Sequence, residues 1–520
     1  SLSGENRQIS VIGLEGALSS SATIEQISIS DDEGVWLTID NAVLDWNRLA
    51  LIRGNFSVNA LTADAIRLER SPTPTPQDPE LPTPEATPFQ LPELPVAVEL
   101  GEIRVNRIEL GKDLMGTAAS LSLNGSLKLA DGALDSDLLV SRLDRPGDLL
   151  RLEASFLNET SVISLDLALE ESTNGLVASL LDLPGRPTVR LSAQGTGPVD
   201  DFQANLELDT NGTRRLGGQL VLATLPSGDS ETPNSISFSA DLGGDIDPLI
   251  APPYRPFFGP GIRANLKGHT DPDGRITLDN LVLRTQALQL TGALALASGS
   301  VLETANIKAA ITPPAGQAAV LLPVAGGATT LAGVELTVQK TAGADWQVKA
   351  LLDRLSHPGL SLSRAEVTAG GTLDQSDGFA INGDINATLT GIKPADTALA
   401  QALGGQINFA GTLATQGDGG LKITNVALRG SDYRASGGAQ IEGLGSGLKI
   451  TTDLHLDAAD LTRFSGLAGR PIDGAVNAKI KGFAAPLSGT FDVDLTVQAN
   501  QLSVGITQLD PLIAGVTTLS

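Results

Sequence analysis

Few side chains in this chain have the types and spacing that chemistry requires. The only histidines are His269, His357 and His455, and none has a second candidate ligand at the spacing of a metal site. Cysteine is absent, which excludes a thiolate nucleophile, a disulfide and a cysteine-based metal site. We therefore predict no catalytic and no metal-binding residues, and interpret the three histidines as surface or turn residues.

Two short motifs come closest to a binding loop. Residues 271–274 (DPDG), with Asp279 downstream, share part of the pattern of a calcium loop. The fifth-position ligand and the closing glutamate are missing, which favours a turn between strands. Residues 443–449 (GLGSGLK) follow no strand-to-helix pattern, so we expect a loop and not a phosphate cradle. The sequence has no Walker A, GxSxG or HExxH motif, and we predict a protein that is not an enzyme and uses no cofactor.

The charge and composition restrict the partners. The chain of 520 residues has 60 acidic and 35 basic side chains, a net charge of −25. Repulsion by phosphate makes nucleic acid and an anionic membrane surface unsuitable partners. Hydrophobic residues make up 41% but aromatic residues only 3%, with 57 glycines. Small aliphatic residues and frequent turns favour many strands in a thin sheet, and the apolar surface must be buried or face something apolar.

One stretch recurs along the chain and is typical of a strand. LTIDNAVL at residues 37–44 returns as ITLDNLVL at 276–283 and more loosely as LKITNVAL at 421–428. Apolar residues alternate in each copy, which predicts a half-buried strand because successive side chains point to opposite faces. The phase breaks at the Asx or Thr-Asn pair, where we expect a β-bulge or tight turn that bends the sheet without ending it.

Longer recurrences suggest a repeated body. Gly185-Arg186-Pro187 matches Gly469-Arg470-Pro471 within two longer similar segments. Recurring units begin near a short apolar segment and continue as alternating strands, at about residues 176–212, 249–298, 321–367, 395–444 and 461–500. These short segments are plugs, crossovers or ordinary core, and we expect core or crossover. The absence of any recurring catalytic residue favours a surface over an active site.

The expected fold class is all-β. Leu121, Leu123, Leu127 and Leu129 share one face of a strand whose other face is polar. We expect a strand-rich segment at 1–70, a proline-rich linker or loop at 71–95, and a repeated body at 96–520. Together they predict an elongated, twisted, largely antiparallel sheet of about 25–35 strands, curled into a half-pipe with an apolar interior and a few short helices. No apolar run reaches the ~18 residues of a membrane-spanning helix.

The first part of the chain resembles the start of the TamB family. GLEGALS at residues 13–19, the DxEGVWLTI pattern at 31–39, and the step from LDW at 44–46 to RGNFSV at 53–58 carry the resemblance. The glycine-punctuated repeats behind them look like the long body of the same family. TamB is the inner-membrane-anchored, periplasm-spanning subunit of the bacterial translocation and assembly module.

The resemblance implies several expectations about fold, location and partners. It implies a β-groove related to AsmA-like and bridge-like lipid transfer proteins, located in the bacterial periplasm. It also implies a signal-anchor helix in the inner membrane ahead of Ser1, and a C-terminal domain that docks on an Omp85-type outer-membrane barrel. With no initiator methionine or signal peptide at Ser1, we expect this chain to be a segment of a longer protein.

The function that the resemblance implies is movement of phospholipid from the inner to the outer membrane in outer-membrane biogenesis. The residues support it physically, because keeping an acyl chain of roughly 16 carbons out of water is worth on the order of 10 kcal/mol. An aliphatic trough removes that barrier without trapping the lipid. The candidate residues that contact acyl chains are Leu37, Ile39, Leu44, Leu121, Leu123, Leu127, Leu129, Ile276, Leu278, Leu281, Leu283, Leu288, Leu290, Ile423, Val426 and Leu428.

Two other interpretations remain. The first is a scaffold for assembly and secretion of outer-membrane proteins and autotransporters, in which strand edges pair with unfolded clients. The second is a closed β-helix, which needs a regular rung of about 20–25 residues. The copies of the recurring stretch start at residues 37, 276 and 421, so their spacing contains no such rung.

Overall fold

Alternating apolar and polar residues make almost every long element of this chain a β-strand. The computed structural model describes residues 8–16, 20–47, 55–73, 97–130, 132–226, 234–324, 329–375, 380–415, 420–442, 449–485 and 490–519. The chain divides into two compact units, which are described separately. Unit 1 is Ser1–Leu281 with Ser298–Ser300, and unit 2 is Val282–Ala297 with Val301–Ser520.

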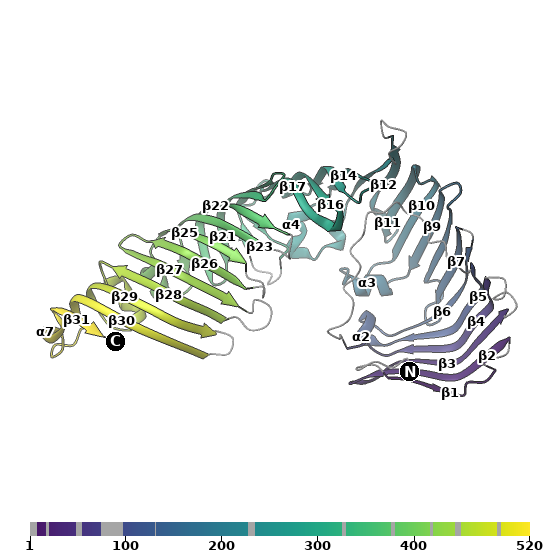
Figure 1. Cartoon of the computed structure of the whole chain (residues 1–520), viewed down its shortest axis with the longest axis horizontal. Coiled ribbons are helices and arrows are strands. Elements are labelled where there is room, and N and C mark those ends of the chain that lie inside the picture. The colour runs from purple at the N-terminus through teal and green to yellow at the C-terminus, as the bar shows by residue number, and fades with distance from the viewer. Residues whose placement is uncertain are drawn as a thin grey trace. The chain divides into compact units, whose positions relative to one another are not determined.

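Unit 1 contains the first strands and short helices (Figure 1). Its strands are β1 (Gln8–Ile12), β2 (Ser21–Asp31), β3 (Gly34–Asn47), β4 (Asn55–Leu68), β5 (Ala97–Leu110), β6 (Ala119–Ala130), β7 (Ala133–Arg142), β8 (Leu149–Leu157), β9 (Val162–Glu171), β10 (Val189–Pro198), β11 (Asp201–Thr210), β12 (Thr213–Leu225), β13 (Ser235–Gly244) and β14 (Ile262–Thr270). Its helices are α2 (Lys112–Met115), α3 (Leu176–Leu180), α4 (Arg255–Phe258) and the 3-10 turns η1 (Asp247–Leu249), η2 (Pro252–Tyr254) and η3 (Ser298–Ser300). Strand β15 (Ile276–Arg284) contains the boundary between the units.

The strands of unit 1 pair in sequence order from β1 to β14. All of these pairs are antiparallel except β4–β5, which is parallel. The parallel pair flanks the proline-rich segment, of which residues 74–95 lie outside the described residues. A parallel pair needs a long connection, because the chain must return to the end of the sheet where the first strand began. The proline-rich segment is this connection.

Unit 2 repeats the arrangement. Its strands are β16 (Leu288–Ala297), β17 (Val301–Ile311), β18 (Val320–Leu321), β19 (Thr330–Leu331), β20 (Gly333–Lys340), β21 (Asp345–His357), β22 (Leu360–Asp374), β23 (Ala380–Thr390), β24 (Lys393–Pro394), β25 (Gln406–Thr415), β26 (Leu421–Arg429), β27 (Tyr433–Glu442), β28 (Lys449–Ala458), β29 (Asp473–Ala485), β30 (Thr490–Ser503) and β31 (Val516–Leu519). Its helices are α5 (Thr397–Leu403), η4 (Thr462–Phe464), α6 (Ser465–Ala468) and α7 (Asp510–Ile513).

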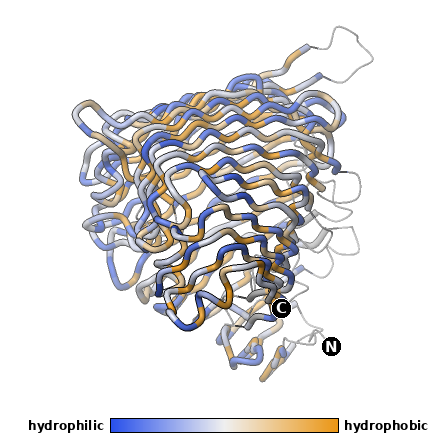
Figure 2. Tube along the Cα trace, turned by 90° about the vertical axis from the view of Figure 1, so that its left-hand side faces the viewer, coloured by the Kyte–Doolittle hydropathy of each residue, from blue (hydrophilic) through white to orange (hydrophobic). Residues whose placement is uncertain are grey.

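The main sheet of unit 2 is antiparallel. The long strands pair in the order β16, β17, β20, β21, β22, β23, β25, β26, β27, β28, β29, β30, β31. The two-residue strands β18, β19 and β24 attach at the ends of the long ones. Figure 2 shows hydrophobic and hydrophilic residues alternating along the strands, as the sequence predicts.

Short segments leave the sheet at regular intervals, and we call them cap segments. In unit 1 they contain α2 after β5, α3 after β9, and η1, η2 and α4 after β13; in unit 2 they contain α5 after β24, and η4 and α6 after β28. In unit 1 four strands separate successive caps, and an even number of antiparallel strands returns the chain to the same end of the sheet. Three of the caps bury a residue: Ala178 on α3, Phe257 on α4 and Ala402 on α5.

The recurring stretch forms one strand in which the alternation of apolar and polar residues changes phase partway along. In the third copy, Thr424 and Asn425 of β26 lie opposite the single residue Gly438 of β27, which is the expected bulge, and Asn425 has φ +52°. In the first copy Asn41 also has φ +50°. Strands β2 and β4 pair with β3 residue for residue through this position, so no extra residue is inserted and the alternation changes phase on the three strands together. The bulge prediction is thus confirmed for the third copy and replaced by a coordinated shift in the first.

The predicted fold class is confirmed. The chain is all-β, with a long, largely antiparallel sheet and a few short helices, and the described residues contain 31 strands. In unit 1 the sheet curls, and α2 and α3 lie inside the curve (Figure 1). Among the described residues, no helix has both the length and the apolar character needed to cross a membrane.

Candidate functional site

The three histidines lie on different strands, and of them His269 is next to the aspartate-rich turn. His269 on β14 contacts Asp279 on β15 through Nδ1 at 3.2 Å, and His357 on β21 contacts Thr329 at 3.1 Å. Residues 271–274 form the predicted turn between β14 and β15. Within the described ranges, no three metal-ligand side chains come together. Residues 443–448 of the glycine-rich stretch lie outside those ranges.

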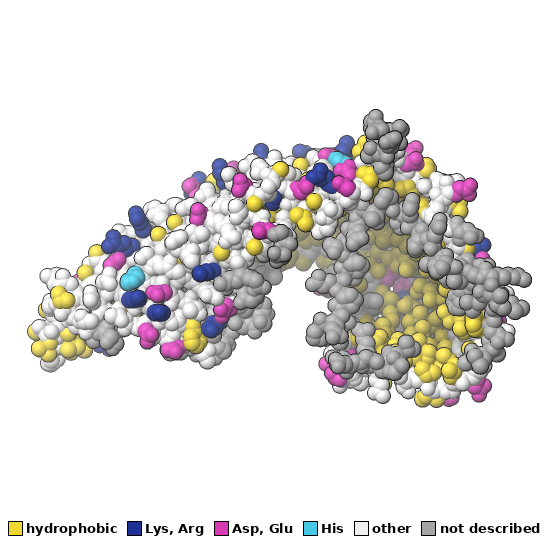
Figure 3. All heavy atoms as spheres, in the orientation of Figure 1, with side chains coloured by type: hydrophobic (Ala, Val, Ile, Leu, Met, Phe, Trp, Pro, Cys, Tyr) yellow, Lys and Arg dark blue, Asp and Glu magenta, His cyan; other side chains and the backbone are white. Residues whose placement is uncertain are grey.

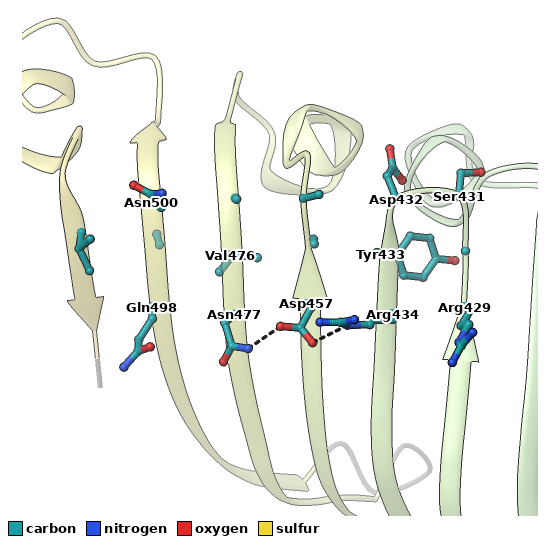
Figure 4. A pocket seen from close by; sticks show the side chains of 16 residues that line it. Arg429, Ser431, Asp432, Tyr433, Arg434, Asp457, Val476, Asn477, Gln498 and Asn500 are labelled. Atoms are coloured by element: carbon teal, nitrogen blue, oxygen red, sulfur yellow. Dashed lines mark hydrogen bonds and ion pairs between the residues drawn. The ribbon is translucent and has the colours of Figure 1, made fainter.

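A pocket of about 750 Å³ lies in unit 2 across strands β26 to β31 (Figure 4). Arg434 on β27 donates to Asp457 on β28 at 3.0 Å, and Asn477 on β29 donates to the other carboxylate oxygen at 2.5 Å. These two hydrogen bonds, that of Arg434 first, hold the pKa of Asp457 below its usual range. The carboxylate therefore stays ionised near neutral pH and serves to join three strands, because a general acid would need a raised pKa.

The two cap segments of unit 2, which contain α5 and α6, share a small hydrophobic core at the strand ends. Tyr433, Ala458 and Leu461 are buried there, and the Tyr433 hydroxyl donates to the Leu403 carbonyl at 2.9 Å. The Arg463 guanidinium lies over the Tyr433 ring at 5.3 Å. Burial raises the pKa of Tyr433. This cluster holds α5 and α6 over the ends of the strands. It does not cover the middle of the strands.

The middle of unit 1 has an unbroken apolar face. Residues that lie directly opposite one another on neighbouring strands share a face. From β6 to β12 one such row runs Leu123, Val140, Leu150, Leu169, Leu191, Leu208 and Leu216. A second row from β2 to β6 runs Ile27, Ile39, Ile66, Ile108 and Leu121. This face is therefore aliphatic along both rows, which together cover β2 to β12.

The apolar face of unit 2 alternates large and small residues. One row from β16 to β30 runs Leu290, Ala309, Leu336, Ala350, Val367, Ala387, Phe409, Leu428, Ala435, Leu456, Ala478 and Val497. Small residues between large ones give a surface with shallow depressions and no charge. A flexible hydrocarbon chain gains contact on such a surface without meeting a specific pocket.

The sixteen candidate lining residues are spread over four strands in addition to β15. In unit 1 the rows place Ile39 and Leu121 on one face, and Leu44 joins it through Leu61 and Ile103 opposite Gly125. Leu290 and Leu428 lie in the row of unit 2 given above. The candidates thus belong to the extended faces of two units and form no single compact site. The remaining members occupy β3 (Leu37), β6 (Leu123, Leu127, Leu129), β15 (Ile276, Leu278, Leu281, Leu283), β16 (Leu288) and β26 (Ile423, Val426).

The apolar faces are open to a substantial degree. All sixteen candidates are half-buried, neither sealed in a core nor fully exposed. Some members of the same faces are exposed outright: Leu61 is 40% exposed, Leu220 44% and Leu495 50%. Figure 3 shows the hollow of unit 1 lined with hydrophobic side chains. Half-exposed aliphatic surface on this scale marks an interaction surface in a protein that remains folded.

In the part of unit 1 that the rows above cover, charged residues interrupt the apolar face only at the ends of the strands. Arg142 and Asp148, at the adjoining ends of β7 and β8, are 7% and 2% exposed, and their side chains approach to 3.7 Å. Sequence analysis missed this pair. The alternation Leu138, Val140, Arg142 was the available signal, since it places the arginine on the apolar face.

Comparison with known proteins assigns no relative. No family model matches the chain, and no curated protein and no solved structure matches it either.

Proposed function

We propose that the apolar faces of the two units carry the acyl chains of phospholipids, and that the chain is part of a periplasmic conduit between the inner and outer bacterial membranes. The observation that supports this most strongly is the uninterrupted aliphatic rows across the strands of each unit. Each methylene kept from water contributes about 0.8 kcal/mol, so a 16-carbon chain finds roughly 10 kcal/mol of stabilisation on such a face. The head group stays in water at the open side.

The resemblance of residues 9–70 to the TamB family supports the same proposal. In that setting the chain is the groove-forming part of a translocation and assembly module. Its membrane anchor and its Omp85-type partner then belong to the full-length protein. The lack of any recurring catalytic residue agrees with passive carriage and not with lipid chemistry.

A charge placed on the apolar face tests the proposal. Leu290→Asp on β16 puts a carboxylate among aliphatic residues, and Thr291→Asp puts the same group on the polar face, where Thr291 lies opposite Lys308. We expect phospholipid that co-purifies with the protein, measured by mass spectrometry, to fall for Leu290→Asp and to stay unchanged for Thr291→Asp. Equal lipid content in both variants would count against lipid carriage.

The second candidate function is a scaffold for assembly of outer-membrane proteins. Exposed apolar side chains in unit 2 favour it: Val516 on β31 is 81% exposed and Leu512 on α7 is 79% exposed. An exposed strand edge is a template for pairing with an extended client. Crosslinks from residue 516 to unfolded client strands, with no lipid on the apolar faces, would select this function over lipid carriage.

A further inference from the structure

A small apolar pocket lies under the cap helix α3 in unit 1. It has a volume of about 230 Å³ and lies between the helix and the inner face of the sheet. Most residues that line it are aliphatic, among them Leu121, Val140, Leu150 and Leu169 on the sheet and Leu176 and Leu180 on the helix. The pocket is therefore a place where the apolar face has walls on two sides.

The pocket is a continuation of the apolar face. Val140, Leu150 and Leu169 are consecutive members of the row that continues to Leu191 and Leu208. A hydrocarbon chain that lies along this row can thus enter the pocket without leaving apolar surroundings.

Charged side chains close the pocket at the strand ends. Glu171 accepts from the backbone N–H of Val177, at 2.9 Å and 3.0 Å to its two oxygens, and so holds the start of α3. Asp148 accepts from Ser172, at 2.7 Å from the backbone N–H and 2.6 Å from the hydroxyl. Arg142 donates to Asp144 at 3.1 Å. Within the described residues, Nη1 of Arg142 and Oδ2 of Asp148 have no hydrogen-bond partner and lie 3.7 Å from each other, so these charged groups form a polar wall.

The size and the charge of the pocket select the part of a lipid that fits. An apolar cavity of about 150 Å³ accepts a six-carbon ring, so about 230 Å³ holds a chain segment of roughly eight to ten carbons. The wall contains two carboxylates, Asp148 and Glu171, against one guanidinium, Arg142. The net negative charge of this wall repels a phosphate head group, whereas an uncharged methyl end is not repelled and packs against the aliphatic side chains.

We propose that the pocket under α3 binds the methyl end of one acyl chain and so holds a lipid at a fixed point on the apolar face of unit 1. This inference rests on the proposed lipid-carrying function. Glu171 acts as a positioning residue, because it fixes the helix that forms the upper wall. A lipid in this pocket is oriented with its head group away from the strand ends that lie under α3.

Photolabelling with the full chain tests the pocket. The probe is a phosphatidylcholine with a diazirine at the methyl end of one acyl chain, supplied in vesicles, and the labelled peptides are identified by mass spectrometry. We expect labels on α3 and on the open face at Leu206. A phosphatidylcholine with the diazirine on its head group should leave α3 unlabelled, and strong labelling of α3 by that probe would overturn the proposed orientation.

Two neighbouring leucines supply a matched pair of variants. Leu180 lines the pocket and is 58% exposed, while Leu181 does not line it and is 62% exposed. A tryptophan at position 180 occupies part of the pocket, and an acyl chain that loses the burial of about two methylenes there binds roughly tenfold more weakly. We expect Leu180→Trp to lose α3 labelling by that factor and Leu181→Trp to keep it.

The outcomes separate the pocket from the function. Labels at Leu206 with none on α3, or equal α3 labelling in the two variants, would overturn the pocket and leave lipid carriage in place. The absence of labels at both positions would overturn both. Because both leucines are exposed, neither variant threatens the fold, and equal melting temperatures confirm that the comparison is fair.

Discussion

Asn41 on β3 donates a hydrogen bond from Nδ2 to Oδ2 of Asp64 on β4 at 3.0 Å. The other carboxylate oxygen of Asp64 accepts from Asn106 on β5 at 3.2 Å. One carboxylate therefore ties three strands together where their alternation changes phase. The phase change keeps apolar residues on the inner face on both sides of the shift, since Ile39 and Leu44 both reach it. These polar contacts thus preserve the continuity of the apolar face.

The conformation of Asn41 predicts which substitution it tolerates. Its φ of +50° suits asparagine and glycine, whereas alanine in that region costs about 1 kcal/mol or more. We expect Asn41→Ala to lower the free energy of unfolding by about that amount and Asn41→Gly to lower it less. Asn59, which donates to Asp45 at 3.1 Å without a positive φ, provides the control. Equal losses for Asn41→Ala and Asn59→Ala in urea unfolding would refute the role of the backbone conformation.

The hydrogen bonds of Glu171 predict a local effect on α3. Glu171 is 8% exposed and accepts from the helix start, so its removal leaves a buried N–H without its partner. We expect Glu171→Ala to cost about 1–3 kcal/mol and to raise hydrogen exchange at the amides of α3. Glu170→Ala breaks only the exposed ion pair with Arg190 and should cost less than about 1 kcal/mol. Unchanged exchange at α3 in the first variant would show that Glu171 does not hold the helix.

The lowered pKa of Asp457 predicts an acid-side loss of stability. A folded-state pKa below the unfolded value means that the contribution is present above the unfolded pKa of about 3.9 and is lost as pH falls through the folded pKa. We expect Asp457→Asn to be less stable than the wild type at pH 7 and to approach it as pH falls below about 4. Unfolding midpoints measured at several pH values check this. A constant difference across that range would contradict the ionic role.

The alternation of residue types was enough to predict the strands and their apolar face. Leu121 to Leu129 gave the phase of β6, and the register shows Leu123 in the predicted apolar row. The asparagine of the recurring stretch correctly indicated a change of phase. Such features are local, because a strand exposes its alternation within a few residues.

Features that depend on which strands become neighbours could not be read from the sequence. The parallel pairing of β4 with β5 follows from a connection of unusual length, and the sequence indicated only a linker there. The polar wall at the cap edge unites Arg142, Asp148 and Glu171 from three different strand ends. The pairing of Asp64 with Asn41 and Asn106 likewise requires the register. These contacts depend on which strands pair and in which register. The periodicity of a single sequence does not contain that information.

The most direct test of lipid carriage is a scan of photo-crosslinking residues along one strand, β11, in protein incubated with phospholipid vesicles. Leu206 and Leu208 lie on the apolar face, while Asn205 and Glu207 alternate with them on the polar face. We expect acyl-chain adducts at residues 206 and 208 and none at 205 and 207, which is the period of two that a one-sided sheet imposes. Adducts at all four positions, or at none, would contradict the claim that the apolar face carries lipid.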